Sequence, residues 1–156
     1  MAISVFFCAM RVGAQTQTIS TSALVNMKVK STSSLTVNRD LSMGVVVQGA
    51  TSLVVDPING GNSAAYFSLS APPNTPVTVS FSSTPLTDGV NSILFSGTLA
   101  GSNGTVQSQA TLLGNGSAAT TSPTGSYYFW AGGRAILSAT QEIGFYAGSF
   151  VLTIAY

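Results

Sequence analysis

The sequence predicts an all-β domain folded as an antiparallel β-sandwich, and three observations support this fold class. Short candidate strands recur at close spacing, no stretch has convincing helical periodicity, and Gly, Pro, Asn and Ser cluster between the strands. We expect about nine or ten short strands in an Ig-like or pilin-like arrangement. A closed barrel is the structural alternative.

The last stretch of the chain has the clearest strand pattern, because large apolar residues alternate with small or polar ones from residue 144 to the final residue. This pattern is typical of a strand with one buried face, which needs a partner along its edges. We therefore expect it to form one wall of an assembly groove. The large residues of this groove strand are Tyr146, Phe150, Leu152, Ile154 and Tyr156.

A second alternating stretch spans residues 19–30 and is followed by a Ser- and Thr-rich joint at residues 31–34. Its apolar face could complete the sheet of its own chain or that of a neighbour, since the joint permits either. We treat residues 15–34 as a candidate donor strand with its joint. The donor face consists of Ile19, Ala23, Val25, Met27 and Val29.

The sandwich domain itself is assigned to residues 35–156, because a chain of 156 residues suits one domain with one core. Between the two patterned ends, strands are expected at residues 35–37, 41–47, 51–55, 64–70, 76–83, 92–99, 105–113, 126–130 and 134–138. Turns are expected at residues 38–40, 59–62, 71–74, 101–104, 114–125 and 132–133.

Residues 1–14 resemble the end of a secretory signal peptide. An apolar run from Ala2 to Met10 precedes Arg11, and Val12 and Ala14 occupy the positions where a signal peptidase prefers small residues. The run is much shorter than the ~20 residues of a membrane helix, so we expect no membrane span. Secretion to the extracellular space or the cell surface is the expected location.

The alternative for this segment is a retained N-terminal strand, because Ile3, Val5, Phe7 and Ala9 alternate with their neighbours. Cys8, the only cysteine, lies here as well. Cleavage would therefore leave a mature domain without disulfides or thiolate metal sites.

Composition argues against an enzyme. The chain has no His, and its only acidic residues are Asp40, Asp56, Asp88 and Glu142. A catalytic triad, a cysteine nucleophile and a His-rich metal site are therefore not expected, and neither is a cofactor. A carboxylate pair for glycoside hydrolysis is formally possible, but all four acidic residues lie in turn or surface contexts.

Charge and hydroxyl content favour self-association. Only 6% of residues are charged and the net charge is +1, so no basic surface for nucleic acid is expected. The 41 Ser and Thr residues must cover much of the surface. A surface with so little charge repels its copies weakly.

The aromatic run Tyr127, Tyr128, Phe129 and Trp130 has two interpretations. These rings could form a platform on which sugars stack. Because a strand turns alternate side chains to opposite faces, core packing is the favoured role.

Several segments resemble a family of secreted bacterial β-domains catalogued as a domain of unknown function (DUF4402-like). The similarity covers about residues 23–156 and rests on residues 38–44, 54–57, 64–67, 132–133 and 141–156. Met43 and the Leu152-Thr153-Ile154 run depart from the usual pattern. The resemblance implies secretion and a sandwich, and it supplies no catalytic residue. The terminal strands also resemble, more loosely, those of pilin-like subunits that lend one strand to a neighbour.

Together these observations predict a structural subunit of an extracellular, pilus-like filament. Copies of the chain would assemble head to tail by β-strand addition, or donor-strand exchange, as a homopolymer. The alternative is a monomeric carbohydrate-binding or adhesion module at the cell surface, with surface glycans as partners of residues 127–130.

Overall fold

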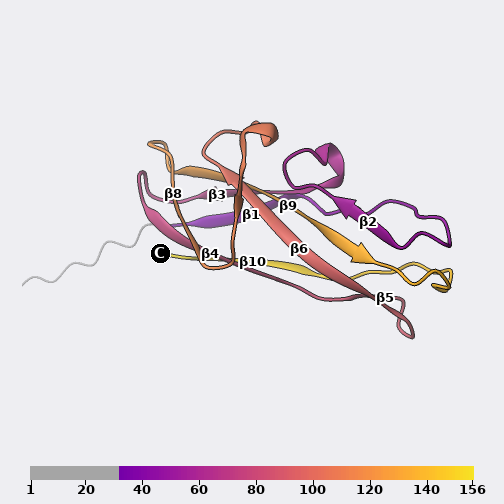
Figure 1. The fold of residues 1–156 in the computed structure, drawn as a ribbon. Coiled ribbons are helices and arrows are strands. Elements are labelled where there is room, and N and C mark those ends of the chain that lie inside the picture. The colour runs from indigo at the N-terminus through magenta and orange to yellow at the C-terminus, as the bar shows by residue number, and fades with distance from the viewer. Residues whose placement is uncertain (1–31) are drawn as a thin grey trace, which may run out of the picture.

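A computed structural model of the chain describes residues 32–156, which form an all-β sandwich of two antiparallel sheets (Figure 1). The strands are β1 (Ser34–Arg39), β2 (Ser52–Val55), β3 (Ala65–Ser70), β4 (Pro76–Ser83), β5 (Leu86–Thr87), β6 (Ser92–Ser102), β7 (Thr111–Leu113), β8 (Ser117–Thr120), β9 (Ser126–Ile136) and β10 (Phe150–Ala155). Two 3-10 turns, η1 (Gly61–Ser63) and η2 (Gln107–Gln109), complete the secondary structure of the described part. The predicted fold class is confirmed.

The two sheets differ in width. The wide sheet has the order β1-β3-β9-β6-β5, with β2 added to β9 and β7 added to β6, whereas the narrow sheet has the order β10-β4-β8. Every strand pairing is antiparallel. The strands thus form two separate layers, and the described part of the chain folds as a sandwich.

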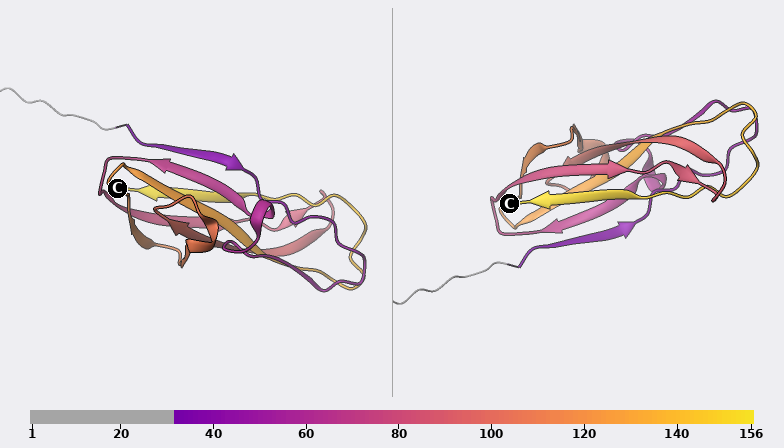
Figure 2. Two further views of the ribbon diagram at one scale, coloured as in Figure 1. Left: turned by 90° about the horizontal axis from the view of Figure 1, so that it is seen from above. Right: turned by 90° about the horizontal axis from the view of Figure 1, so that it is seen from below.

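The ends of the sandwich can be named from the strand register. Ser34 at the start of β1 pairs with Ser70 at the end of β3, and Ala155 near the C-terminus pairs with Thr78 near the start of β4. The turn at residues 71–75 joins β3 to β4 at this end, which we call the base. The opposite end, the tip, carries the loops at residues 40–51, 88–91 and 137–149 (Figures 1 and 2).

The core lies between the sheets and follows the alternation of the strands. Its largest fully buried side chains are Phe129, Leu99, Val77 and Val79. A smaller cluster of Ile93, Phe95 and Ala135 lies toward the tip. A third cluster, centred on Trp130, packs against the outer face of the wide sheet. Burial alternates along β3 and the first half of β4, so the apolar pattern of the sequence sets their register. The centre of β9 is buried on both faces.

The expected turn at Gly132-Gly133 is wrong, because β9 runs without a break from Ser126 to Ile136. The two glycines serve close packing instead. A Cβ at Gly132 would collide with the carbonyl oxygen of Val55 and lie 2.8 Å from the nitrogen of Pro57, whereas one at Gly133 would lie 2.6 Å from the Phe95 ring. Glycine in a strand interior often marks such a close approach.

Several further boundaries differ from expectation. β1 extends to Arg39 and β6 to Ser102, so parts of the expected turns at residues 38–40 and 101–104 lie in strands. Residues 41–47 form no strand, because Leu41 and Met43 turn into the core clusters and Gly44 has a φ of 77°. Only Thr111–Leu113 of the expected strand at 105–113 is extended, after the turn η2. Conversely, β8 lies within a stretch that was expected to be a turn, and it pairs with β4. Small residues at 117–120 gave too weak an apolar pattern to indicate it.

The part of the chain that the structure describes contains no helix long and apolar enough to cross a lipid bilayer.

The close packing at Gly132 gives a stability prediction. Gly132→Ala should lower the free energy of unfolding by about 1–3 kcal/mol or prevent folding, because its methyl group has no space beside Val55 and Pro57. Gly104→Ala is the matched control, since its nearest neighbour would be Ser102 Oγ at 3.8 Å. Urea unfolding of both variants measures the difference. Equal stability of the two would contradict the packing role of Gly132.

Candidate assembly site

The last strand, β10, forms one edge of the narrow sheet. It pairs with β4 from Phe150 opposite Ser83 to Ala155 opposite Thr78, and within residues 32–156 it has no second strand partner. Its even positions Phe150, Leu152 and Ile154 pack against the main core, but all three remain partly exposed. This edge therefore offers both unpaired backbone groups and a half-covered apolar row.

Phe150, the first member of this row, contacts both sheets. Its ring stacks on Phe81 of β4 at a centroid distance of 5.6 Å and reaches Phe67 of the wide sheet at 6.4 Å. Gly97 of β6 provides the space, because a Cβ there would lie 2.6 Å from the Phe150 ring. The start of β10 is therefore fixed between the two sheets.

In the wide sheet, β1 is the corresponding edge. Leu35 pairs with Leu69 and Val37 pairs with Phe67, so these side chains share the inner face of the sheet. Although Leu69 and Phe67 are buried, Leu35 remains 37% and Val37 57% exposed. Within residues 32–156, the inner face of β1 is thus only partly covered.

A groove of about 480 Å³ lies on the tip side of these two edges, where the end of β1 and the start of β10 contribute to its lining. One wall comes from β1 and the residues that follow it, including Val37 and Leu41, and the other comes from residues 145–150. Phe67 and Phe95 form part of the floor. In the view from below in Figure 2, β4 lies on one side of β10, whereas β3 and, beyond it, β1 of the wide sheet lie on the other side. The groove is thus open where a further strand of the narrow sheet would lie.

The five residues predicted for the groove strand do not all share one strand. Phe150, Leu152 and Ile154 form the inward row of β10, whereas Tyr156 follows the strand and is exposed. Tyr146 precedes the strand and packs against the tip-side cluster. Its hydroxyl accepts a hydrogen bond from Gln141 Nε2 at 2.8 Å and donates one to the carbonyl of Glu142 at 2.9 Å. The regular strand begins at Phe150 rather than Gly144, because Thr84 and Thr87 bond the preceding backbone irregularly.

The predicted donor face lies outside the described residues. The same holds for the signal-peptide segment and its alternative as a retained strand.

The aromatic run at residues 127–130 does not present an exposed platform. Tyr127 and Phe129 face the core between the sheets, and Trp130 is buried on the outer face beneath Ile58 and Ala110. Core packing, the favoured interpretation, is confirmed for these three. Tyr128 stays partly exposed beside Tyr66, with ring centroids 6.2 Å apart.

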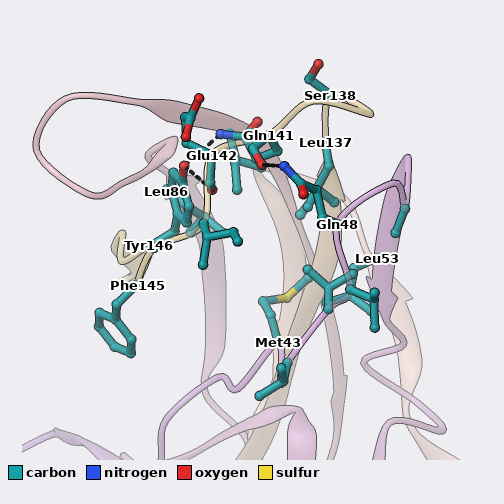
Figure 3. Close-up of a pocket in the computed structure, with 18 of the residues that line it drawn as sticks. Met43, Gln48, Leu53, Leu86, Leu137, Ser138, Gln141, Glu142, Phe145 and Tyr146 are labelled. Atoms are coloured by element: carbon teal, nitrogen blue, oxygen red, sulfur yellow. Dashed lines mark hydrogen bonds between the residues drawn. The ribbon is translucent and has the colours of Figure 1, made fainter.

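Sequence reasoning missed a second feature, the three loops of the tip. Gln48 Nε2 donates a hydrogen bond to the carbonyl of Gln141 at 3.2 Å, and Thr87 and Ala147 exchange backbone hydrogen bonds of 2.8 and 3.0 Å. An apolar cavity of about 360 Å³ opens between the loops at residues 40–51 and 137–149, and Met43 and Leu53 lie on one of its sides (Figure 3). Phe145 points away from the cavity in Figure 3.

The tip loops gave a misleading signal in the sequence. Val45, Val46 and Val47 were expected in a strand, and Phe145 was expected within one continuous final strand that Ile143 directly precedes. Outside a sheet, such residues have no covering layer, and several of them are exposed. Gly44 and Gly49, which flank this apolar run, were the sequence feature that could have indicated a loop rather than a strand.

Two of the acidic residues, Asp56 and Asp88, hold turns through side-chain hydrogen bonds. Asp56 accepts hydrogen bonds from the N–H of Ile58 and the side chain of Asn59, which lower its pKa. At the tip, Asp88 accepts bonds from the side chain and backbone of Asn91 and from the N–H of Val90, and these lower its pKa to about 2. Residues 32–156 contain no cluster of three metal-ligating side chains.

The Asp88 turn gives a titration prediction. Because the folded pKa is below the ordinary 3.8, the carboxylate stabilises the loop above that pH, and this contribution is lost as the pH falls toward 2. Asn91→Ala should raise the pKa toward 3.8, since it removes the largest cause of the shift. An NMR titration of the Asp88 carboxyl measures this, with Asn103→Ala as the control. An unchanged pKa in Asn91→Ala would contradict the assignment.

Compared with known proteins, the chain matches no family model and no curated protein. The resemblance to secreted β-domains therefore stays a prediction.

Proposed function

We propose that this chain is the structural subunit of an extracellular filament in which copies assemble head to tail by strand addition. One observation carries the proposal. Val37 of β1 and Phe150 of β10 both line an open groove. Leu35 of β1, and Leu152 and Ile154 of β10, are further partly exposed apolar side chains of the same two strands. A single added strand could bond to β10 and cover both rows.

The stretch at residues 19–30 has the pattern that such a groove requires. Its donor face is apolar at alternate positions, while Asn26, Lys28 and Lys30 alternate with that face. A strand of this kind would turn its apolar side to the core and its polar side to solvent. Resemblance to pilin-like subunits supports the same mode of assembly.

The direction in which the donor segment would run beside β10 favours its donation to a neighbouring copy. β10 runs from the tip to the base, and β1 begins at the base. A donor segment from a copy stacked beyond the tip would run from base to tip and lie antiparallel to β10. The same segment folded back into its own groove would run parallel to β10. It would also need a tight turn at residues 31–33, which contain only Ser and Thr. Antiparallel pairing is slightly more stable per residue.

Filament formation can be tested with one charge. Val25→Asp should abolish filaments, because a carboxylate on the donor face would be buried without a partner in the groove. Asn26→Asp is the matched control, since its neighbouring position faces solvent in the same strand. Gel filtration and electron microscopy of the full chain provide the measurement. Filaments of Val25→Asp that match the unmodified protein would contradict the proposal.

The direction of the strand has its own test, in a Cys8→Ser background. Lys30→Cys with Ser149→Cys should form disulfides between copies, because residue 30 of the incoming segment would lie at the tip end of β10. Non-reducing electrophoresis should then show a ladder of multimers. Lys30→Cys with Ala155→Cys should form none. A monomeric disulfide in this second variant would instead show that the segment fills the groove of its own chain.

A further inference from the structure

The tip exposes an unusual amount of apolar surface. Five large side chains in its three loops are 81–100% exposed, and together they present on the order of several hundred Å². They are Val45, Val47, Val90, Ile143 and Phe145. Exposed apolar patches of this size mark interaction sites in soluble proteins.

The base presents a surface that fits such a patch. Pro73 and Pro123 are exposed there, the C-terminal Tyr156 is 69% exposed, and residues 69–78 and 117–128 contain no charge. Proline and tyrosine side chains are therefore exposed at this end, and the surrounding segments have no charged side chains.

The base is also rigid. The hydroxyl of buried Thr121 donates to the carbonyl of Pro72 at 2.7 Å and accepts from the N–H of Thr75 at 2.8 Å. The N–H of Ala71 donates to the carbonyl of Gly125 at 2.8 Å, and the hydroxyl of Ser122 accepts from the N–H of Ser126 at 3.0 Å. These bonds join the two base turns, so little conformational entropy would be lost when a partner binds there.

We infer that the apolar tip of one copy binds the proline-bearing base of the next copy. This inference rests on the proposed head-to-tail assembly, because a segment that runs antiparallel to β10 must come from a copy whose base lies beyond the tip. The groove leads to this contact, since Met43, Leu86 and Tyr146 line both the groove and the tip cavity. A second copy is therefore the partner that covers the exposed side chains.

The distribution of charged residues also supports a second copy of the chain as the partner. The tip loops carry Asp40, Asp88 and Glu142, whereas both arginines of the described part, Arg39 and Arg134, lie on strands. Lys28 and Lys30 precede the joint in the sequence, so they would reach the tip of the receiving copy. Acidic loops would then face basic residues of the incoming segment.

The contact can be trapped in the full chain carrying Cys8→Ser. Ile143→Cys with Pro73→Cys should give a ladder of disulfide-linked multimers under mild oxidation. Ile143→Cys with Thr98→Cys is the control, because Thr98 is exposed in the middle of β6, away from both ends. The control pair should give few or no multimers. Equal ladders from both pairs would overturn the inference.

A second measurement needs no cysteine. Ile143→Ser with Phe145→Ser should weaken association roughly tenfold or more, because two apolar side chains leave the contact. Both positions are 87% exposed, so the fold should be retained. Val106→Ser, an exposed apolar position outside the tip and the base turns, should leave filament length unchanged.

The outcomes separate the two proposals. Suppose that Val25→Asp abolishes filaments while the Ile143→Cys with Pro73→Cys protein forms filaments without disulfide-linked multimers. That pair of results would overturn the tip contact alone. Filaments that persist in Val25→Asp would overturn strand donation as well. Unchanged filaments of the double serine variant, with weaker binding to octyl-agarose, would assign the tip to an outside apolar partner and overturn the inference.

Discussion

The packing of the narrow sheet on the wide one is the interaction on which the sandwich depends. Phe150 lies between Phe81 and Phe67, and Gly97 leaves room for its ring. This contact positions β10 as an edge strand with a half-covered row. Because only β4 pairs with it within residues 32–156, the sandwich presents a groove at the point where its two sheets would otherwise close. The groove and the proposed assembly both follow from that arrangement.

Alternating apolar residues were sufficient to predict the fold class, the extent of β4 and the inward row of β10. Other features depend on tertiary contacts that no local pattern encodes. Gly132 and Gly133 look like a turn in isolation, yet they lie inside β9 because neighbouring backbone and the Phe95 ring approach them closely. The small residues of β8 are extended because β4 provides a partner.

The groove itself was only partly predictable. The sequence indicated the inward side of β10, but not that Leu35 and Val37 would remain exposed opposite it. The apolar tip was missed, because valines in a loop and valines in a strand have the same local pattern. Only the fold shows that residues 40–51, 88–91 and 137–149 meet at one end. Such long-range meeting of loops depends on topology, which strand patterns do not specify.

The proposed addition of an antiparallel strand beside β10 would have a mechanical consequence. In a filament built from such subunits, tension along the fibre would pull the added strand lengthwise against β10. Hydrogen bonds between antiparallel strands lie perpendicular to the strands, so lengthwise pulling loads all of them together. Separation would then require many bonds to break at once rather than one after another. The edge that makes the isolated domain open to association would thus become the part of the fibre that resists force.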